Sequence, residues 1–184
     1  MTKSVKRVTT IVLQLTLRAA GRIAILSQAD AARQALVVDA PGVARYRIQE
    51  YVRWEDIDAA GIINYQAYLR FFALAEAEML REAGLSYRFL FESLGIWLPR
   101  VRVECQFYRP AKLDELLSVE AYSSRIGNRS LHLDFEVRRH EEPDLVASGK
   151  YILVCVRQKD FVPVPVPEEI RSRIRRFHED SFQP

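Results

Sequence analysis

The sequence predicts an α+β domain in which one long helix packs on an antiparallel sheet of five or six strands. Apolar residues recur at helical spacing between Tyr65 and Ala83, and several segments downstream alternate apolar and polar residues. Short polar turns separate these segments. Strands joined by short turns pair antiparallel, because parallel neighbours need a crossover connection of about a dozen residues.

The first two elements are a strand and the long helix. Apolar residues alternate with polar ones from Ala44 to Trp54, and an acidic loop at residues 55–61 follows. The helix is expected from Tyr65 to Ala83, where Gly84 ends it. Its apolar face is wide, and such a face needs a sheet to cover it.

Further strands are predicted wherever apolar residues occupy alternate positions, at residues 101–107, 117–121, 131–138 and 151–156. The last of these is almost continuously apolar, as is typical of a central strand covered on both faces. Prolines at 163, 165 and 167 end the sheet. A terminal helix is expected up to Phe177, with acidic residues first and arginines last.

The composition is that of one globular domain. The chain has 184 residues, of which 49% are hydrophobic and 28% charged, enough to form a core without disulfides or a metal. The net charge is +3, but residues 1–29 hold five basic residues and no acid, so the remaining 22 basic and 24 acidic residues sum to −2. Nucleic-acid binding is not expected, because it needs clustered basic residues over the domain itself.

Residues 1–43 are predicted to be a leader outside the domain, which then spans residues 44–178 and leaves a tail at 179–184. The uncharged stretch Val8–Leu17 has ten residues, and a membrane span needs about twenty, so stable membrane insertion is not expected. An Arg-rich, acid-free leader fits an organelle transit peptide, which would place the protein in a mitochondrion or plastid. A start assigned too far upstream fits equally well and leaves the protein in the bacterial cytoplasm.

No residue pattern indicates a metal, dinucleotide or phosphate-loop site. Cys105 and Cys155 lie in separate apolar stretches, so we expect two buried thiols. The three histidines form no ligand pair, and the seven glycines form no phosphate-binding loop. We therefore expect no metal and no organic cofactor.

The acidic loop before the long helix is the candidate for chemistry. Asp58 lies a few residues before a helix N-terminus, whose unpaired N–H groups and positive dipole end favour developing negative charge. The amides near Asn64 and Tyr65 can polarise a carbonyl oxygen while Asp58 attacks it or activates water. The spacing alone leaves a second interpretation open, because solvated acidic loops and caps before helices are common.

Two segments carry a resemblance to a known family. Trp54–Phe72 contains the pattern D-x-D-x-x-G-h-h-x-[YH]-x-x-Y, and this pattern resembles that of the 4-hydroxybenzoyl-CoA thioesterase-like family of hot-dog-fold acyl-CoA thioesterases. Phe107–Leu116 is similar to the second recurrent segment of the same family. The resemblance spans about residues 45–160 and implies a hot-dog fold, an antiparallel sheet wrapped on one long central helix.

The resemblance implies hydrolysis of an acyl-CoA thioester, with Asp58 as nucleophile or general base. It also implies that Gly61 forms a tight loop, that the Tyr65 amide faces the thioester oxygen and that a second copy completes the site in a homodimer or homotetramer. The cations for coenzyme A are expected at the hairpin formed by Arg125, Asn128, Arg129 and Ser130, although turn arginines are also ordinary solvated charges.

Two other functions stay open at this point. The substrate thioester can be carried by an acyl carrier protein instead of coenzyme A. A non-hydrolytic acyl-CoA-binding protein is also possible, because Ala67 and Ala73 stand where the family often has polar residues.

Glu76 is the odd residue of the long helix. Its helical angle places it within the apolar face, where a carboxylate is costly unless it is paired. It therefore has an arginine partner, lines the acyl pocket or sits at a subunit contact. Structural pairing is favoured over a catalytic role.

Overall fold

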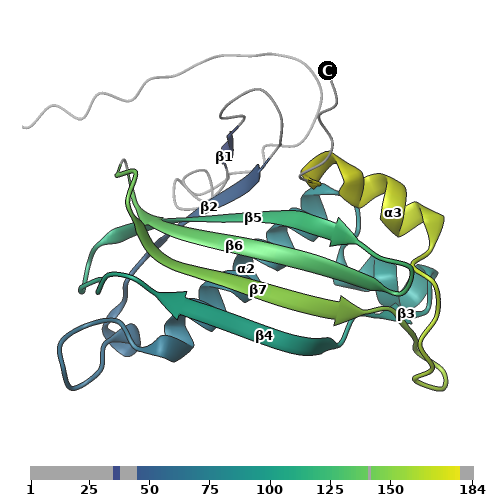
Figure 1. The fold of residues 1–184 in the computed structure, drawn as a ribbon, viewed down its shortest axis with the longest axis horizontal. Coiled ribbons are helices and arrows are strands. Elements are labelled where there is room, and N and C mark those ends of the chain that lie inside the picture. The colour runs from purple at the N-terminus through teal and green to yellow at the C-terminus, as the bar shows by residue number, and fades with distance from the viewer. Residues whose placement is uncertain (1–34, 38–44, 141, 179–184) are drawn as a thin grey trace, which may run out of the picture.

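The computed structural model describes residues 35–37, 45–140 and 142–178. Six strands form one sheet in the order β1-β2-β5-β6-β7-β4, in which every neighbouring pair is antiparallel. The long helix α2 (Tyr65–Glu82) lies against one face of this sheet (Figure 1). The strands are β1 Ala35–Val37, β2 Arg45–Tyr51, β4 Arg100–Phe107, β5 Leu116–Ile126, β6 Ser130–Arg139 and β7 Leu145–Val154. The predicted fold class is confirmed.

The core lies between α2 and the sheet. The ring of Phe72 is fully buried and stacks on Phe135, with 4.9 Å between ring centroids. It approaches β7 so closely that a Cβ atom built on Gly149 would lie 2.3 Å from it. Glycine is therefore required at this position of β7.

Strand β7 begins earlier than the sequence predicts and ends before residue 156. It includes Gly149 and Lys150, and the glycine makes the close contact with Phe72. The strand is central, between β6 and β4. Its burial alternates between buried and half-buried positions, so the prediction of full coverage on both faces is wrong.

Strand β4 is present as predicted, but it lies at the edge of the sheet and its burial does not alternate. It pairs with β7 on one side, and no strand of the described residues pairs with its other side. The apolar side chains of Val101, Val103 and Phe107 are consequently exposed, by 63%, 46% and 53%. Cys105 on the same strand is half-buried and Cys155 is buried, so only one of the two thiols is as enclosed as expected.

The two ends of the chain fall partly outside the described residues. Strand β1 pairs Ala35–Val37 with Arg45–Arg47 of β2, so the sheet reaches into the segment that the sequence assigns to the leader. The remainder of residues 1–43 and the tail at 179–184 lie outside the described residues. The terminal helix is present as α3 (Glu168–Ile174), followed by a 3-10 turn to Phe177. No helix in the described ranges is long and apolar enough to span a membrane.

Candidate active site

The loop between β2 and α2 is a tight, internally bonded turn. The backbone N–H of Asp58 donates to the carbonyl of Ile62 at 3.0 Å, and the N–H of Gly61 donates to the carbonyl of Asp58 at 3.0 Å. Gly61 has a φ of +74°, a conformation that glycine adopts without strain. The Asp58 carboxylate accepts one hydrogen bond within the loop, from the N–H of Ala60 at 2.8 Å, and the residue is exposed.

The other aspartate of the motif, Asp56, is structural. Its side chain is buried, and both carboxylate oxygens lie 2.7 Å from Nη2 of Arg70 on α2. Its backbone carbonyl accepts from the N–H and the side-chain amide of Asn64, at 2.7 and 2.8 Å. Asp56 thus ties the loop to the start of α2, and Asp58 is the carboxylate left to meet a substrate.

The first turn of α2 leaves one backbone donor available. The side-chain oxygen of Asn64 caps the helix by accepting from the N–H groups of Gln66 and Ala67, at 2.9 and 3.1 Å. The N–H of Asn64 itself is bonded to Asp56, so the predicted contribution of this amide to a carbonyl site is wrong. The N–H of Tyr65 has no acceptor among the described residues. The Tyr65 amide is therefore the helix-terminal donor that an incoming oxygen can use.

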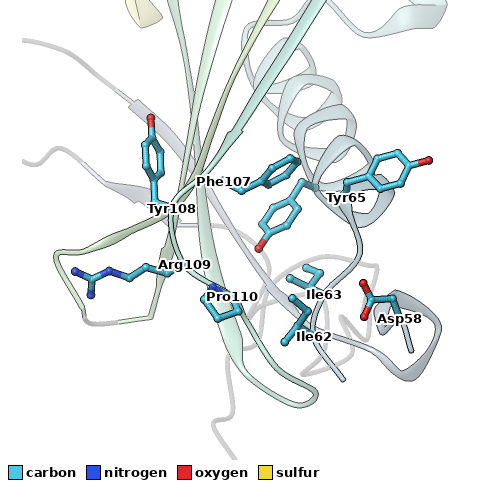
Figure 2. Close-up of a pocket in the computed structure, with 9 residues that line it drawn as sticks. Asp58, Ile62, Ile63, Tyr65, Phe107, Tyr108, Arg109 and Pro110 are labelled. Atoms are coloured by element: carbon cyan, nitrogen blue, oxygen red, sulfur yellow. The ribbon is translucent and has the colours of Figure 1, made fainter. Parts of the chain in front are cut away.

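A pocket of about 480 Å³ joins this loop to the end of β4. Figure 2 shows Asp58 and Tyr65 on the loop and helix side and Phe107, Tyr108 and Arg109 on the strand side. The remaining lining residues are Ile62, Ile63, Tyr68 and Pro110. The N–H of Ile63 donates to the carbonyl of Ala111 at 2.9 Å, which holds the two sides together. The structure thus brings Asp58 and Tyr65 to the same mostly apolar pocket.

Tyr68 lies on the helix side of the pocket, with its ring 5.2 Å from that of Phe107. Burial raises the pKa of Tyr68 to about 12. Its hydroxyl therefore stays protonated near neutral pH and can act as a hydrogen-bond donor, not as a base.

Arg109 is a pocket residue that sequence reasoning missed. It follows β4 directly and forms an ion pair with Asp144 at the surface. The sequence places it in a turn about fifty residues after the acidic loop, and the bond between Ile63 and Ala111 brings the turn to that loop. A cation at the mouth of an apolar pocket is suited to hold an anionic group of a ligand.

The hairpin with the four candidate coenzyme A contacts lies elsewhere. Strand β5 begins at Leu116, which pairs with Tyr51 beside the acidic loop. It ends at Ile126, ten residues further along, so the two ends of the strand are about 33 Å apart. There the carbonyls of Ile126 and Gly127 accept from Arg171 of α3, at 3.4 and 3.0 Å. Within one chain, Arg125, Asn128, Arg129 and Ser130 therefore do not meet Asp58.

Glu76 has the arginine partner that its sequence position requires. Its side chain is 1% exposed, it forms an ion pair with Nη2 of Arg100, and it accepts from the hydroxyl of Tyr87 at 3.3 Å. Burial raises the pKa of Glu76, and the charge of Arg100 opposes this shift. Structural pairing is confirmed.

The antiparallel sheet around a long central helix, with its acidic loop at the helix N-terminus, defines a hot-dog fold. Residues 52–174 match the family model of the thioesterase-like superfamily, and the chain belongs to this superfamily.

Several relatives with assigned activities are similar over most of their length. A 1,4-dihydroxy-2-naphthoyl-CoA hydrolase from Synechococcus elongatus is 25% identical over 131 residues, which cover 71% of this chain and 95% of the relative. The acyl-CoA thioesterase YbgC of Haemophilus influenzae is 28% identical, and the match covers 66% of this chain and 88% of the relative. Among solved structures, a 1,4-dihydroxy-2-naphthoyl-CoA thioesterase from Synechocystis has a TM-score of 0.65 at 23% identity, covering 71% of this chain and 96% of its own. The last comparison supports the fold alone.

Proposed function

We propose that this protein hydrolyses an acyl-CoA thioester to the free carboxylate and coenzyme A. The observation that carries the proposal is the pairing, in one pocket, of the exposed Asp58 carboxylate with the N–H of Tyr65 at a helix N-terminus, which has no acceptor in the part of the chain that the structure describes. Membership of the thioesterase-like superfamily and the names of the relatives support the same reaction.

The Tyr65 amide binds the carbonyl oxygen of the thioester and stabilises the negative charge that develops on it. Asp58 either takes a proton from water as the water attacks the carbonyl carbon, or attacks that carbon itself and forms an anhydride that water then cleaves. In both routes the carbon–sulfur bond breaks, the electron pair leaves with the sulfur, and the thiolate of coenzyme A is protonated.

Release of free thiol tests the reaction. The protein is incubated separately with aromatic, short-chain and long-chain acyl-CoA thioesters and with the matching acyl carrier protein thioesters, and the released thiol is followed with a chromogenic disulfide. The proposal predicts catalytic release from at least one class, above the rate without enzyme. Release only from acyl carrier protein thioesters would favour the protein-borne substrate, and binding of acyl-CoA without release would identify a non-hydrolytic binding protein.

We also infer that two copies of the chain associate through β4. The open edge of β4 in one copy can pair with β4 of a second copy, with the two strands running antiparallel. A two-fold axis through Val103 then places Arg102 of one copy opposite Glu104 of the other. The same symmetry covers the exposed apolar side chains and removes an open sheet edge. It brings the Arg125–Ser130 hairpin of one copy toward the Asp58 end of the other, which supports the predicted coenzyme A contacts.

Sedimentation equilibrium tests the association. A dimer or tetramer of the 21.3 kDa chain at micromolar concentration is the expected result. A fully active monomer would contradict it.

A further inference from the structure

A second pocket, of about 500 Å³, lies near β3 (Ile96–Trp97), at the end of the molecule away from the Asp58 loop. Its walls come from the segment after α2 and from the loop around Phe161. Four of its lining residues are aromatic, and two others, Arg100 and Gln158, are polar. The Asp58 mechanism uses none of them.

The aromatic side chains form a continuous wall. Tyr87 stacks on Phe91 with an interplanar angle of 15° and 5.8 Å between centroids. Phe91 meets the edge of Trp97 at 6.3 Å, and Trp97 meets the edge of Phe161 at 5.8 Å. Phe91 and Phe161 are still 38% and 55% exposed, so aromatic surface is left for a ligand.

Two irregular backbone segments place these rings. Phe161 has a φ of +60°, which is costly for a bulky side chain. Its loop is held there by bonds from the N–H of Phe161 to the carbonyl of Arg157, at 2.9 Å, and from Arg157 Nε to Asp160, at 3.0 Å. Phe91 lies in a π-helical turn, Phe89–Ser93. Strained residues and π-helical turns are both frequent at ligand sites.

The one charged side chain among the lining residues, Arg100, presents donors and no acceptor. The Glu76 carboxylate is 1% exposed and is covered by Arg100 and Tyr87, whereas the Arg100 side chain is 34% exposed. One face of this guanidinium lies 5.0 Å over the ring of Tyr151. A molecule in the pocket therefore meets N–H groups of Arg100, which favour an anion or a hydrogen-bond acceptor.

We propose that this pocket binds a planar aromatic carboxylate, with its ring against Trp97 and Phe161 and its carboxylate on Arg100. The ligand is a free aromatic acid, because the acyl group of a thioester has no carboxylate to place on Arg100. The proposal does not depend on hydrolysis, because it concerns binding alone.

Calorimetric titration with 2-naphthoate tests the proposal. We expect binding at least about tenfold tighter than that of its fully saturated analogue, because only the aromatic ring stacks on the wall. We expect a similar preference over 2-naphthalenemethanol, which keeps the ring and lacks the charge.

Phe161→Gly is the informative variant. Glycine adopts a φ of +60° freely, so the fold is expected to be retained or stabilised while one wall of the pocket is lost. Affinity for 2-naphthoate should fall by about tenfold. Tyr51→Ala, which removes a ring of similar exposure (59%) outside both pockets, serves as the matched control and should not change the affinity.

Equal affinity for the aromatic and the saturated acid would overturn the proposal, as would unchanged binding by Phe161→Gly. If the protein hydrolyses no thioester, the titration still decides the proposal.

Discussion

Arg100→Met is expected to destabilise the protein strongly, because it leaves the Glu76 carboxylate buried with the Tyr87 hydroxyl as its one remaining partner among the described side chains. Breaking a buried ion pair costs about 3–5 kcal/mol. Because one third of the Arg100 side chain is exposed, water screens part of the pair, and we expect a loss of about 3 kcal/mol. The free energy of unfolding falls by about 2 kcal/mol per M of urea, so a loss of about 3 kcal/mol lowers the urea concentration at the unfolding midpoint by about 1.5 M.

The loss should depend on pH. Burial already raises the pKa of Glu76, and removing Arg100 raises it further. The carboxyl group of Glu76 then binds a proton more tightly in the folded state than in the unfolded state. The variant therefore gains stability as the pH falls from the raised pKa of Glu76 toward the ordinary glutamate value of about 4.3. The difference from the wild-type protein should be largest near pH 8 and smaller near pH 5.

Urea unfolding followed by circular dichroism at both pH values measures these differences. Arg88→Met is the control, because its ion pair with Glu92 is exposed and lies outside β4, and it should cost less than about 1 kcal/mol. The double variant Glu76→Gln with Arg100→Met should recover part of the stability. A loss no larger than that of Arg88→Met, or one that grows on acidification, would refute the reasoning.

Three further predictions concern packing, thiols and the sheet edge. Gly149→Ala should cost about 1–3 kcal/mol of unfolding free energy, because Phe72 leaves no room for a methyl group; thermal melting checks this. Burial raises the pKa of both Cys105 and Cys155 to about 11, so alkylation at pH 8 should be about 10²-fold slower than after unfolding; mass spectrometry measures the rates. Val103→Lys should dissociate the dimer through like charges at the two-fold axis, which sedimentation detects; an unchanged oligomer would exclude pairing through β4.

Patterns along the chain are enough to predict most elements of the fold, because helix and strand periods are local. They do not tell which strand lies at an edge: the alternation in β4 is that of a half-buried strand, yet Val103 is 46% exposed because no described strand follows β4 in the sheet. The sequence also gives no sign of the contact between Gly149 and Phe72, because the two residues lie 77 positions apart.

The candidate site was predictable where its residues are close in sequence. The acidic loop and the helix start supply Asp58 and Tyr65, and local spacing pointed to both. Arg109 could not be assigned, because its place depends on the bond between Ile63 and Ala111 across the fold. Glu76 was recognised as needing a partner, but Arg100 lies beside a bulge at the start of β4, which the sequence does not reveal.

Steady-state hydrolysis by Asp58→Asn tests the central claim most directly. The change keeps the shape of the side chain and removes the charge that attacks or takes a proton, so kcat on the best acyl-CoA should fall by about 10²-fold or more, while KM changes far less. Glu55→Gln, an exposed acid of the same loop, is the control and should keep the wild-type rate. If Asp58→Asn retains turnover within about threefold of the wild-type protein, a difference of less than about 1 kcal/mol in barrier, the aspartate mechanism is contradicted.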